Sequence, residues 1–424
     1  MSPPHSERSP LLNGQREPYT HRVLRVVRGE EGEPSWAASY HHFILGSWSN
    51  ILLLFIPLSF ISHHLNWDAA LRFSFSFIAI LPLAKLLGDA TDQLSLKLGQ
   101  TLSGLLNASF GNAVEIIVGI AALLQGELRI VQTSMLGSIL SNLLLVLGCS
   151  FLAGGFVFSE SNFQVTGAQT SSSLMTLACI TLVIPAAYHA SKADDKAPFP
   201  KNAVTNLMTS LMDNDPPAPD DGTTPGLLAI SRGTAILLLI VYLAYLYFQL
   251  KSHAHLFLEE EDSLNPTEPE EPKMNAVAAG TGLLLVTLLT SFCADYLVAS
   301  IEETATRYHI PKAFIGIVLL PIVANAAEHV TAVWMAMKGK MELTIGICVG
   351  SSIQIATFVI PLLVIVGWIT GHELTLFFAD FETIVLFVSV LLVNLLIMDG
   401  KSNYMEGLML VTLYAVIGLA FWVS

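Results

Sequence analysis

Residues 111–125 read GNAVEIIVGIAALLQ, and residues 324–338 read ANAAEHVTAVWMAMK. Each stretch places one glutamate, Glu115 or Glu328, in a run that is apolar enough to lie in a bilayer. A charged side chain at the bilayer centre costs at least ~2.5–3.5 kcal/mol, so such residues usually face a partner or a water-filled path. Each glutamate follows an asparagine, Asn112 or Asn325, by three residues. The two stretches therefore look like two copies of one polar motif that lies on a cation pathway.

The composition is that of a membrane protein. The chain has 424 residues, of which 53% are hydrophobic and 13% charged, whereas a soluble domain carries roughly 25% charged residues. The apolar residues come in blocks of about twenty, the length that spans a hydrocarbon core. The net charge of −14 arises from acids in the loops and does not indicate nucleic-acid binding. The four cysteines lie scattered in apolar segments without metal-ligand spacing.

The hydrophobic pattern predicts an all-α polytopic fold with about eleven transmembrane helices. A cytosolic, disordered tail is expected over 1–42, because basic residues precede the first apolar block. One extra helix at 43–62 then stands apart from two groups of five, at 69–250 and 275–424, and an acidic cytosolic linker at 251–274 separates the groups. The predicted spans of the two groups are 69–90, 101–124, 131–157, 170–189 and 227–250, then 275–300, 311–337, 343–369, 375–398 and 404–423.

The two groups are related by an internal repeat. At a constant offset of 213 residues, 111–142 matches 324–355 without a gap. Because each group has an odd number of spans, the two copies must lie upside down relative to each other. This is the inverted-repeat plan of many secondary transporters, which bind substrate near the bilayer midplane where the repeats meet. The identical pairs are Asn112/Asn325, Ala113/Ala326, Glu115/Glu328, Gly126/Gly339, Gly137/Gly350 and Ser138/Ser351.

The paired motifs suit a divalent cation. Asparagine and glutamate at i and i+3 share one face of a helix, and hard cations such as Ca²⁺ take six to eight oxygen ligands. Two carboxylates, Glu115 and Glu328, neutralise one divalent ion. A buried carboxyl group that loses its cation tends to take up a proton, so calcium and protons would exclude each other from the site. Sodium remains an alternative counter-ion, and a protonated glutamate that ties helices together remains the structural alternative.

The next helix of each group offers more oxygen ligands. Gly137 and Gly350 precede the polar residues and predict close backbone approach where a transporter helix is bent. The metal ligands predicted from both groups are Glu115, Glu328, Asn112, Asn325, Ser138, Ser141, Ser351 and Gln354, with Asn142 adjacent to Ser141.

Other ionisable residues are candidates for proton coupling or regulation. Asp92 and Glu302 end spans in equivalent regions and could form a vestibule or relay, or simply a solvated helix end. His329 follows Glu328 and so points to another face. The acidic run in the linker, Glu259, Glu260, Glu261 and Asp262, is either solvated or gathers cations at a pore mouth.

The motifs GNAVE and ANAAE, the acidic linker and DGKSNYMEG at 399–407 together resemble the calcium/proton exchanger (CAX) family of the cation/calcium antiporter superfamily. The chain most resembles the vacuolar exchangers of fungi and plants. The resemblance implies an extra first span, ten core spans and import of cytosolic calcium into an acidic vacuole against protons. It also implies that Glu115 and Glu328 are shared ligands of calcium and protons.

The predicted function is thus antiport of Ca²⁺ against H⁺ by alternating access in a vacuolar membrane, with a cytosolic N-terminus and no cofactor. A sodium-coupled or broader divalent (Mn²⁺) exchanger is the alternative, and a cation channel is less favoured. No enzymatic constellation lies in the spans. The partners expected are the two ions and the bilayer, not nucleic acid, and the oligomeric state is left open.

Overall fold

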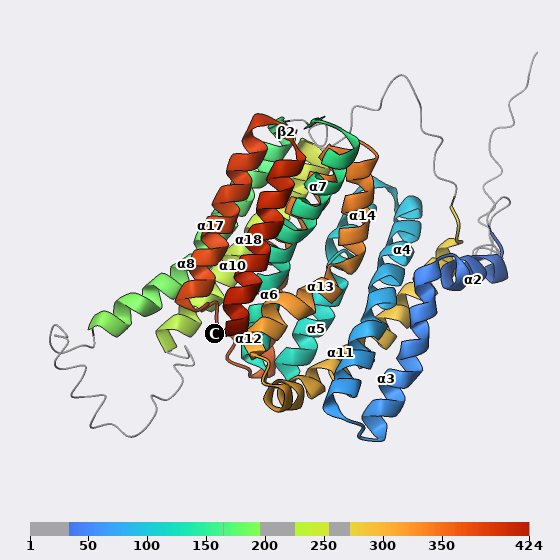
Figure 1. The fold of residues 1–424 in the computed structure, drawn as a ribbon, viewed down its shortest axis with the longest axis horizontal. Coiled ribbons are helices and arrows are strands. Elements are labelled where there is room, and N and C mark those ends of the chain that lie inside the picture. Colours follow the sequence, from blue (N-terminus) through green and yellow to red (C-terminus); the bar gives the residue numbers. More distant parts are fainter. Residues whose placement is uncertain (1–33, 164, 196–224, 254–271, 424) are drawn as a thin grey trace, which may run out of the picture.

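The computed structural model describes residues 34–163, 165–195, 225–253 and 272–423. Most of these residues are helical (Figure 1), and two two-residue strands, β1 (Ser161–Asn162) and β2 (Lys401–Ser402), form an antiparallel pair. The predicted all-α membrane fold is confirmed. Most of the predicted N-terminal tail lies outside the described residues, and so does the acidic run Glu259, Glu260, Glu261 and Asp262.

Among the described residues, eight helices are long and apolar enough to cross a membrane, or ten if each of two bent helix pairs is one span. One bent pair forms the extra N-terminal element. Helix α2 (Trp36–Leu45) meets η1 (Trp48–Leu54) and α3 (Phe55–His64) at an angle of 86°. The structure thus has an elbow where the sequence predicted one helix over 43–62. Helix α3 packs beside α4 and α11 at one end of the molecule (Figure 1).

The first group of helices begins with α4, which turns back on itself. Ser95 Oγ donates a hydrogen bond to Asn107 Oδ1 at 2.9 Å, whereas twelve residues of straight helix span about 18 Å. The predicted separation of 69–90 from the next span is therefore present as a sharp turn. The elements of this group are α4 (Ala69–Phe110), α5 (Ala113–Leu124), α6 (Leu128–Leu140), η2 (Ser141–Val146), α7 (Leu147–Val157), α8 (Val165–Asp195), α10 (Pro225–Tyr247) and η3 (Phe248–Ser252).

The second group contains the other bent pair, in which residues 312–324 and 326–337 meet at 60°. Its elements are α11 (Ala276–Tyr308), α12 (Lys312–Phe314), η5 (Ile315–Leu319), α13 (Leu320–Ala324), α14 (Ala326–Met337), α15 (Met341–Gln354), η6 (Ile355–Val359), α16 (Ile360–Thr370), α17 (Asp380–Leu396), η7 (Ile397–Asp399) and α18 (Tyr404–Val423).

The local backbone repeats at the offset that the sequence showed. Helices α5 and α14 occupy 113–124 and 326–337, and helices α7 and α16 occupy 147–157 and 360–370. The turns between the paired helices contain Gly126 and Gly339, with φ of 78° and 77°. Both long helices pass through a π-helical segment, η2 or η6, before α7 or α16. The inverted orientation of the two groups and a count of eleven spans remain predictions.

Small residues let the two groups pack closely around the site. A Cβ atom on Gly137 would overlap the backbone of Ile317 in η5, so α6 and η5 touch through their main chains. Close backbone approach at small residues is how membrane helices associate without a hydrophobic driving force. The predicted close approach is confirmed at Gly137, but it is wrong at Gly350, where a Cβ atom would have no neighbour within 4 Å.

Candidate cation site

The two asparagines of the paired motifs occupy helix breaks. Helix α4 ends at Phe110 and α5 starts at Ala113, so Asn112 lies between them with φ −109° and ψ 32°. Asn325 separates α13 from α14 in the same way, with φ −85° and ψ 8°. A break in a buried helix frees backbone groups for ligands. Each break therefore opens the backbone three residues before a glutamate, at the asparagine of the motif.

Each glutamate lies in the first turn of the helix that follows the break. The unpaired N–H groups and the macrodipole at a helix N-terminus favour a negative charge there. Glu115 is 3% exposed, Glu328 is partly buried, and the two carboxylates are close enough to interact electrostatically. The two helix N-termini thus bring the two charges of the paired motifs to one place.

A hydrogen-bond network joins the two groups of helices at this place. Asn112 Nδ2 donates to Gln354 Oε1 at 2.5 Å, and Asn112 Oδ1 accepts from Ser351 Oγ at 2.9 Å. Asn142 Nδ2 donates to Glu328 Oε2 and to Ser351 Oγ, both at 2.9 Å. Every bond of the network crosses from one group to the other, which holds the site together as one unit.

Two carbonyl oxygens in the site remain without a hydrogen bond. Asn142 Oδ1 and Asn325 Oδ1 are both buried and have no partner among the described residues. The amide nitrogen of Asn325 donates to the Ser138 backbone oxygen at 3.2 Å, which fixes that side chain. Buried acceptors are normally satisfied, and amide oxygens are ligands that hard cations take. The site therefore offers neutral oxygens beside its carboxylates.

The site contains few charges. Among the described residues, no three His, Cys, Asp or Glu side chains cluster in a way that could hold a metal ion. A cation here would have two carboxylates, and the remaining ligands would be amide, hydroxyl and backbone oxygens. This composition matches hard cations rather than transition metals, which favour imidazole and thiolate ligands.

Several other predicted residues lie elsewhere. Ser141 is buried near Tyr414 of α18 rather than in the network. His329 lines an apolar cavity between α7 and α14 together with Trp334. Glu302 forms an ion pair with Lys312 at exposed helix ends, and Asp92 lines a separate pocket beside α2. None of these four residues takes part in the hydrogen-bond network, so their roles in cation binding or proton coupling remain predictions.

Sequence reasoning underestimated Asn142. It noted this residue only as adjacent to Ser141 and did not include it among the predicted ligands. In the structure Asn142 is the residue that links Glu328 to Ser351. The signal was present as an asymmetry, since Asn142 is the one polar residue that the first copy of 137–142 has and the second copy lacks.

A helical membrane fold with two buried carboxylates at facing helix breaks defines a transporter of cations. The chain belongs to the sodium/calcium exchanger protein family, whose sequence profile matches residues 68–251 and 279–423. The resemblance that the motifs indicated is therefore confirmed.

Similar proteins include exchangers of known type. A vacuolar calcium ion transporter of Schizosaccharomyces pombe is 43% identical over 417 residues, which are 98% of this chain and 93% of the relative. Vacuolar cation/proton exchanger 2 of Oryza sativa is 40% identical over 386 residues, 90% of this chain and 82% of the relative. The crystal structure of the Ca²⁺/H⁺ antiporter YfkE is similar with a TM-score of 0.68 and 30% identity, covering 88% of this chain and 98% of that protein.

Proposed function

We propose that this protein exchanges Ca²⁺ from the cytosol for H⁺ from an acidic lumen by alternating access, with Glu115 and Glu328 as the shared site. The observation that carries the proposal is the meeting of both glutamates, one from each group of helices, at one buried site with free amide oxygens, where hydrogen bonds join the two groups. The names of the similar proteins, two vacuolar transporters and a Ca²⁺/H⁺ antiporter, support it.

The chemistry of exchange follows from the charge of the site. Two buried carboxylates repel each other and are poorly solvated, so they need a compensating positive charge. One Ca²⁺ ion supplies two charges and uses the oxygen ligands, whereas protons neutralise the same carboxyl groups one by one. Occupation by calcium and occupation by protons therefore exclude each other, and this exclusion couples the two fluxes.

Two features favour H⁺ over Na⁺ as the counter-ion of calcium. The Asn142 position of the first group has no polar counterpart in the second, where Ile355 is fully buried. Among the residues that the structure describes, no third carboxylate joins the site, and additional monovalent cations would need one to balance their charge. A manganese ion has the same charge and accepts the same oxygen ligands, so Mn²⁺ is the competing substrate to test.

The proposed location is the membrane of a vacuole or another acidic organelle, with the N-terminus in the cytosol. The exposed lysines Lys338, Lys340 and Lys401 would then lie on cytosolic loops, as the positive-inside rule favours. We propose no enzymatic step and no cofactor, because the transported ions themselves carry the coupling.

Transport into proteoliposomes tests the proposal. The full chain is reconstituted in vesicles with an acidic interior, and uptake of radioactive Ca²⁺ is followed in sodium-free buffer. We expect uptake that stops when a protonophore with valinomycin and potassium collapses the proton gradient. Uptake that persists after this treatment, or that requires sodium inside the vesicles, would contradict exchange against protons. Competition by Mn²⁺ in the same assay measures how strictly calcium is selected.

The proton path is tested with the same vesicles. We propose that the protons bind to Glu115 and Glu328, and that His329, Asp92 and Glu302 contribute at most to access. His329→Ala, Asp92→Asn and Glu302→Gln should then keep calcium uptake driven by the proton gradient. A variant that still exchanges labelled calcium for calcium but loses proton-driven uptake would place the proton path at the substituted residue instead.

A further inference from the structure

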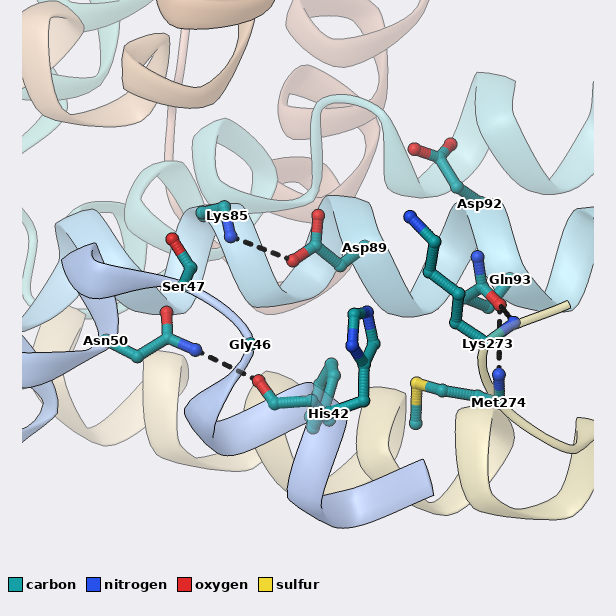
Figure 2. Close-up of a pocket in the computed structure, with 11 residues that line it drawn as sticks. His42, Gly46, Ser47, Asn50, Lys85, Asp89, Asp92, Gln93, Lys273 and Met274 are labelled. Atoms are coloured by element: carbon teal, nitrogen blue, oxygen red, sulfur yellow. Dashed lines mark hydrogen bonds and ion pairs between the residues drawn. The ribbon is translucent and has the colours of Figure 1, made fainter. Parts of the chain in front are cut away.

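A polar cavity that shares no residue with the cation site lies in the elbow between α2 and η1. It has a volume of about 290 Å³ and is also lined by α4 and by the residues that precede α11 (Figure 2). This space equals roughly ten water molecules at about 30 Å³ each. Its polar lining comes from His42, Ser47, Asn50, Lys85, Asp89, Asp92, Gln93 and Lys273.

The cavity lies at the boundary of the membrane region. Lys273 comes just before the start of α11 at Ala276, and α2 bends away from η1 and α3 by 86°. Beside the elbow, the apolar side chains of Trp48, Ile51 and Leu54 are 88%, 67% and 66% exposed. Side chains of this kind contact acyl chains, and tryptophan is typical of the interface. A polar cavity thus adjoins a surface that faces lipid.

One buried oxygen in the cavity lacks a hydrogen-bond donor. The Asn50 side chain is 7% exposed, and its Nδ2 donates to the backbone oxygens of Phe43 and Ile44, both at 3.0 Å. Its Oδ1 is buried without a partner among the described residues. Figure 2 shows this oxygen turned away from the α2 backbone, toward Ser47 and the side of α4 that carries Lys85. A ligand with an N–H or O–H group would satisfy it.

The charged groups of the cavity are of both signs. Gln93 Oε1 accepts hydrogen bonds from the backbone nitrogens of Lys273 and Met274, at 2.8 and 3.1 Å, and so holds Lys273 beside α4. No described residue forms an ion pair with Lys273 within 4 Å. On α4, Asp89 Oδ2 pairs with Lys85 Nζ at 3.2 Å. A ligand that carries both a negative and a positive group would match this lining.

We propose that the cavity binds the headgroup of phosphatidylethanolamine. Its phosphate would face Lys273 and His42, since lysine is a common phosphate ligand. Its ammonium group would donate to Asn50 Oδ1 and Asp89, and its acyl chains would lie along Trp48 and Ile51. Phosphatidylcholine carries the same phosphate and charge, but its ammonium is fully methylated and has no N–H to donate. The unpaired oxygen and the Asp89 carboxylate therefore both select ethanolamine over choline.

Native mass spectrometry of the full chain in detergent tests this assignment. Phosphatidylethanolamine and phosphatidylcholine with identical acyl chains are titrated, and we expect about tenfold tighter binding of the former, the size of one hydrogen bond to a buried group. Asn50→Leu should reduce this preference to the part that Asp89 contributes. Lys273→Gln, which changes an exposed side chain, should weaken the binding of both lipids, and Lys338→Gln, which changes an exposed lysine on another loop, should alter neither.

Three results would overturn the proposal. The first is equal affinity for the two lipids in the wild-type protein, and the second is unchanged phosphatidylethanolamine binding in Lys273→Gln. The third is displacement of the lipid by soluble phosphoethanolamine at the same concentration as by the lipid itself, which would identify a free phosphate compound as the ligand. Lipid binding is read out without transport, so the outcome is independent of the proposed exchange activity.

Discussion

The two copies of the repeat contribute the same backbone to the cation site but different side-chain chemistry. Helices α5 and α14 begin one residue after equivalent asparagines. Yet Asn112 uses both ends of its amide, with Gln354 and Ser351, whereas Asn325 keeps its oxygen free. In this site, therefore, the duplicated backbone fixes where the charges lie, and the diverged side chains decide which oxygens are occupied and which remain for a cation.

The largest effect should come from the two residues that both copies share. Glu115→Gln and Glu328→Gln each remove one of the two charges that balance a divalent ion, so each should abolish calcium uptake in proteoliposomes. Neither should lower the thermal midpoint, because an uncompensated buried charge is removed and the shape is kept. Glu373→Gln, at an exposed residue, is the matched control and should transport normally. Wild-type uptake by either site variant would show that the copies do not share one site.

The next largest effect tests where the copies differ. Asn142→Ala removes the amide that donates a hydrogen bond to Glu328 and another to Ser351. Both acceptors then lose this donor. Losing a hydrogen bond to a charged group in a buried site weakens binding by about tenfold or more, which a calcium titration of uptake would show as a higher half-saturation concentration.

The matched control for Asn142 is Ser352→Ala. Ser352 is also fully buried and is adjacent to Ser351, but its hydroxyl donates only to the Cys348 backbone oxygen in its own helix. Its substitution should leave the half-saturation concentration unchanged. Equal effects of the two variants would mean that general packing, not the link between the copies, sets the affinity.

A third comparison uses glycines at equivalent positions in different surroundings. A Cβ atom on Gly137 would lie 2.6 Å from Ile317 Cα and 2.7 Å from Pro321 Cγ, whereas Gly350 has open space. Gly137→Ala should therefore destabilise by about 2 kcal/mol or more through overpacking. Gly350→Ala should be neutral or stabilise by up to about 1 kcal/mol through helix propensity. Thermal unfolding in detergent measures the stability of both variants. A similar loss of stability in the two would contradict the close contact between α6 and η5 at Gly137.

Much of the architecture could be predicted because the repeat is visible in polar residues. Glu115, Glu328 and their asparagines stand out in apolar runs, and their common offset predicted one site. The helix breaks at Asn112 and Asn325 were not predicted, because an Asn-Ala pair is compatible with a continuous helix. The partners across the site were not predictable either. Spacing along a helix shows which residues share a face, but not that Asn112 meets Gln354 or that Asn142 meets Glu328.

The smallest effect concerns the turns that follow α5 and α14. Gly126 and Gly339 both have positive φ, 78° and 77°, a conformation that costs an L-residue roughly 1–2 kcal/mol. Gly126→Ala meets no atom within 4 Å, so its cost should be this backbone term alone. Gly339→Ala would also place its Cβ atom 3.2 Å from Phe158 Cζ and should be slightly more destabilising. The additional loss of stability in Gly339→Ala should disappear in a Phe158→Ala background. The cost of the positive φ angle is common to both turns, and only the Phe158 contact differs. An additional loss of stability that persists in the Phe158→Ala background would mean that the two turns are not equivalent.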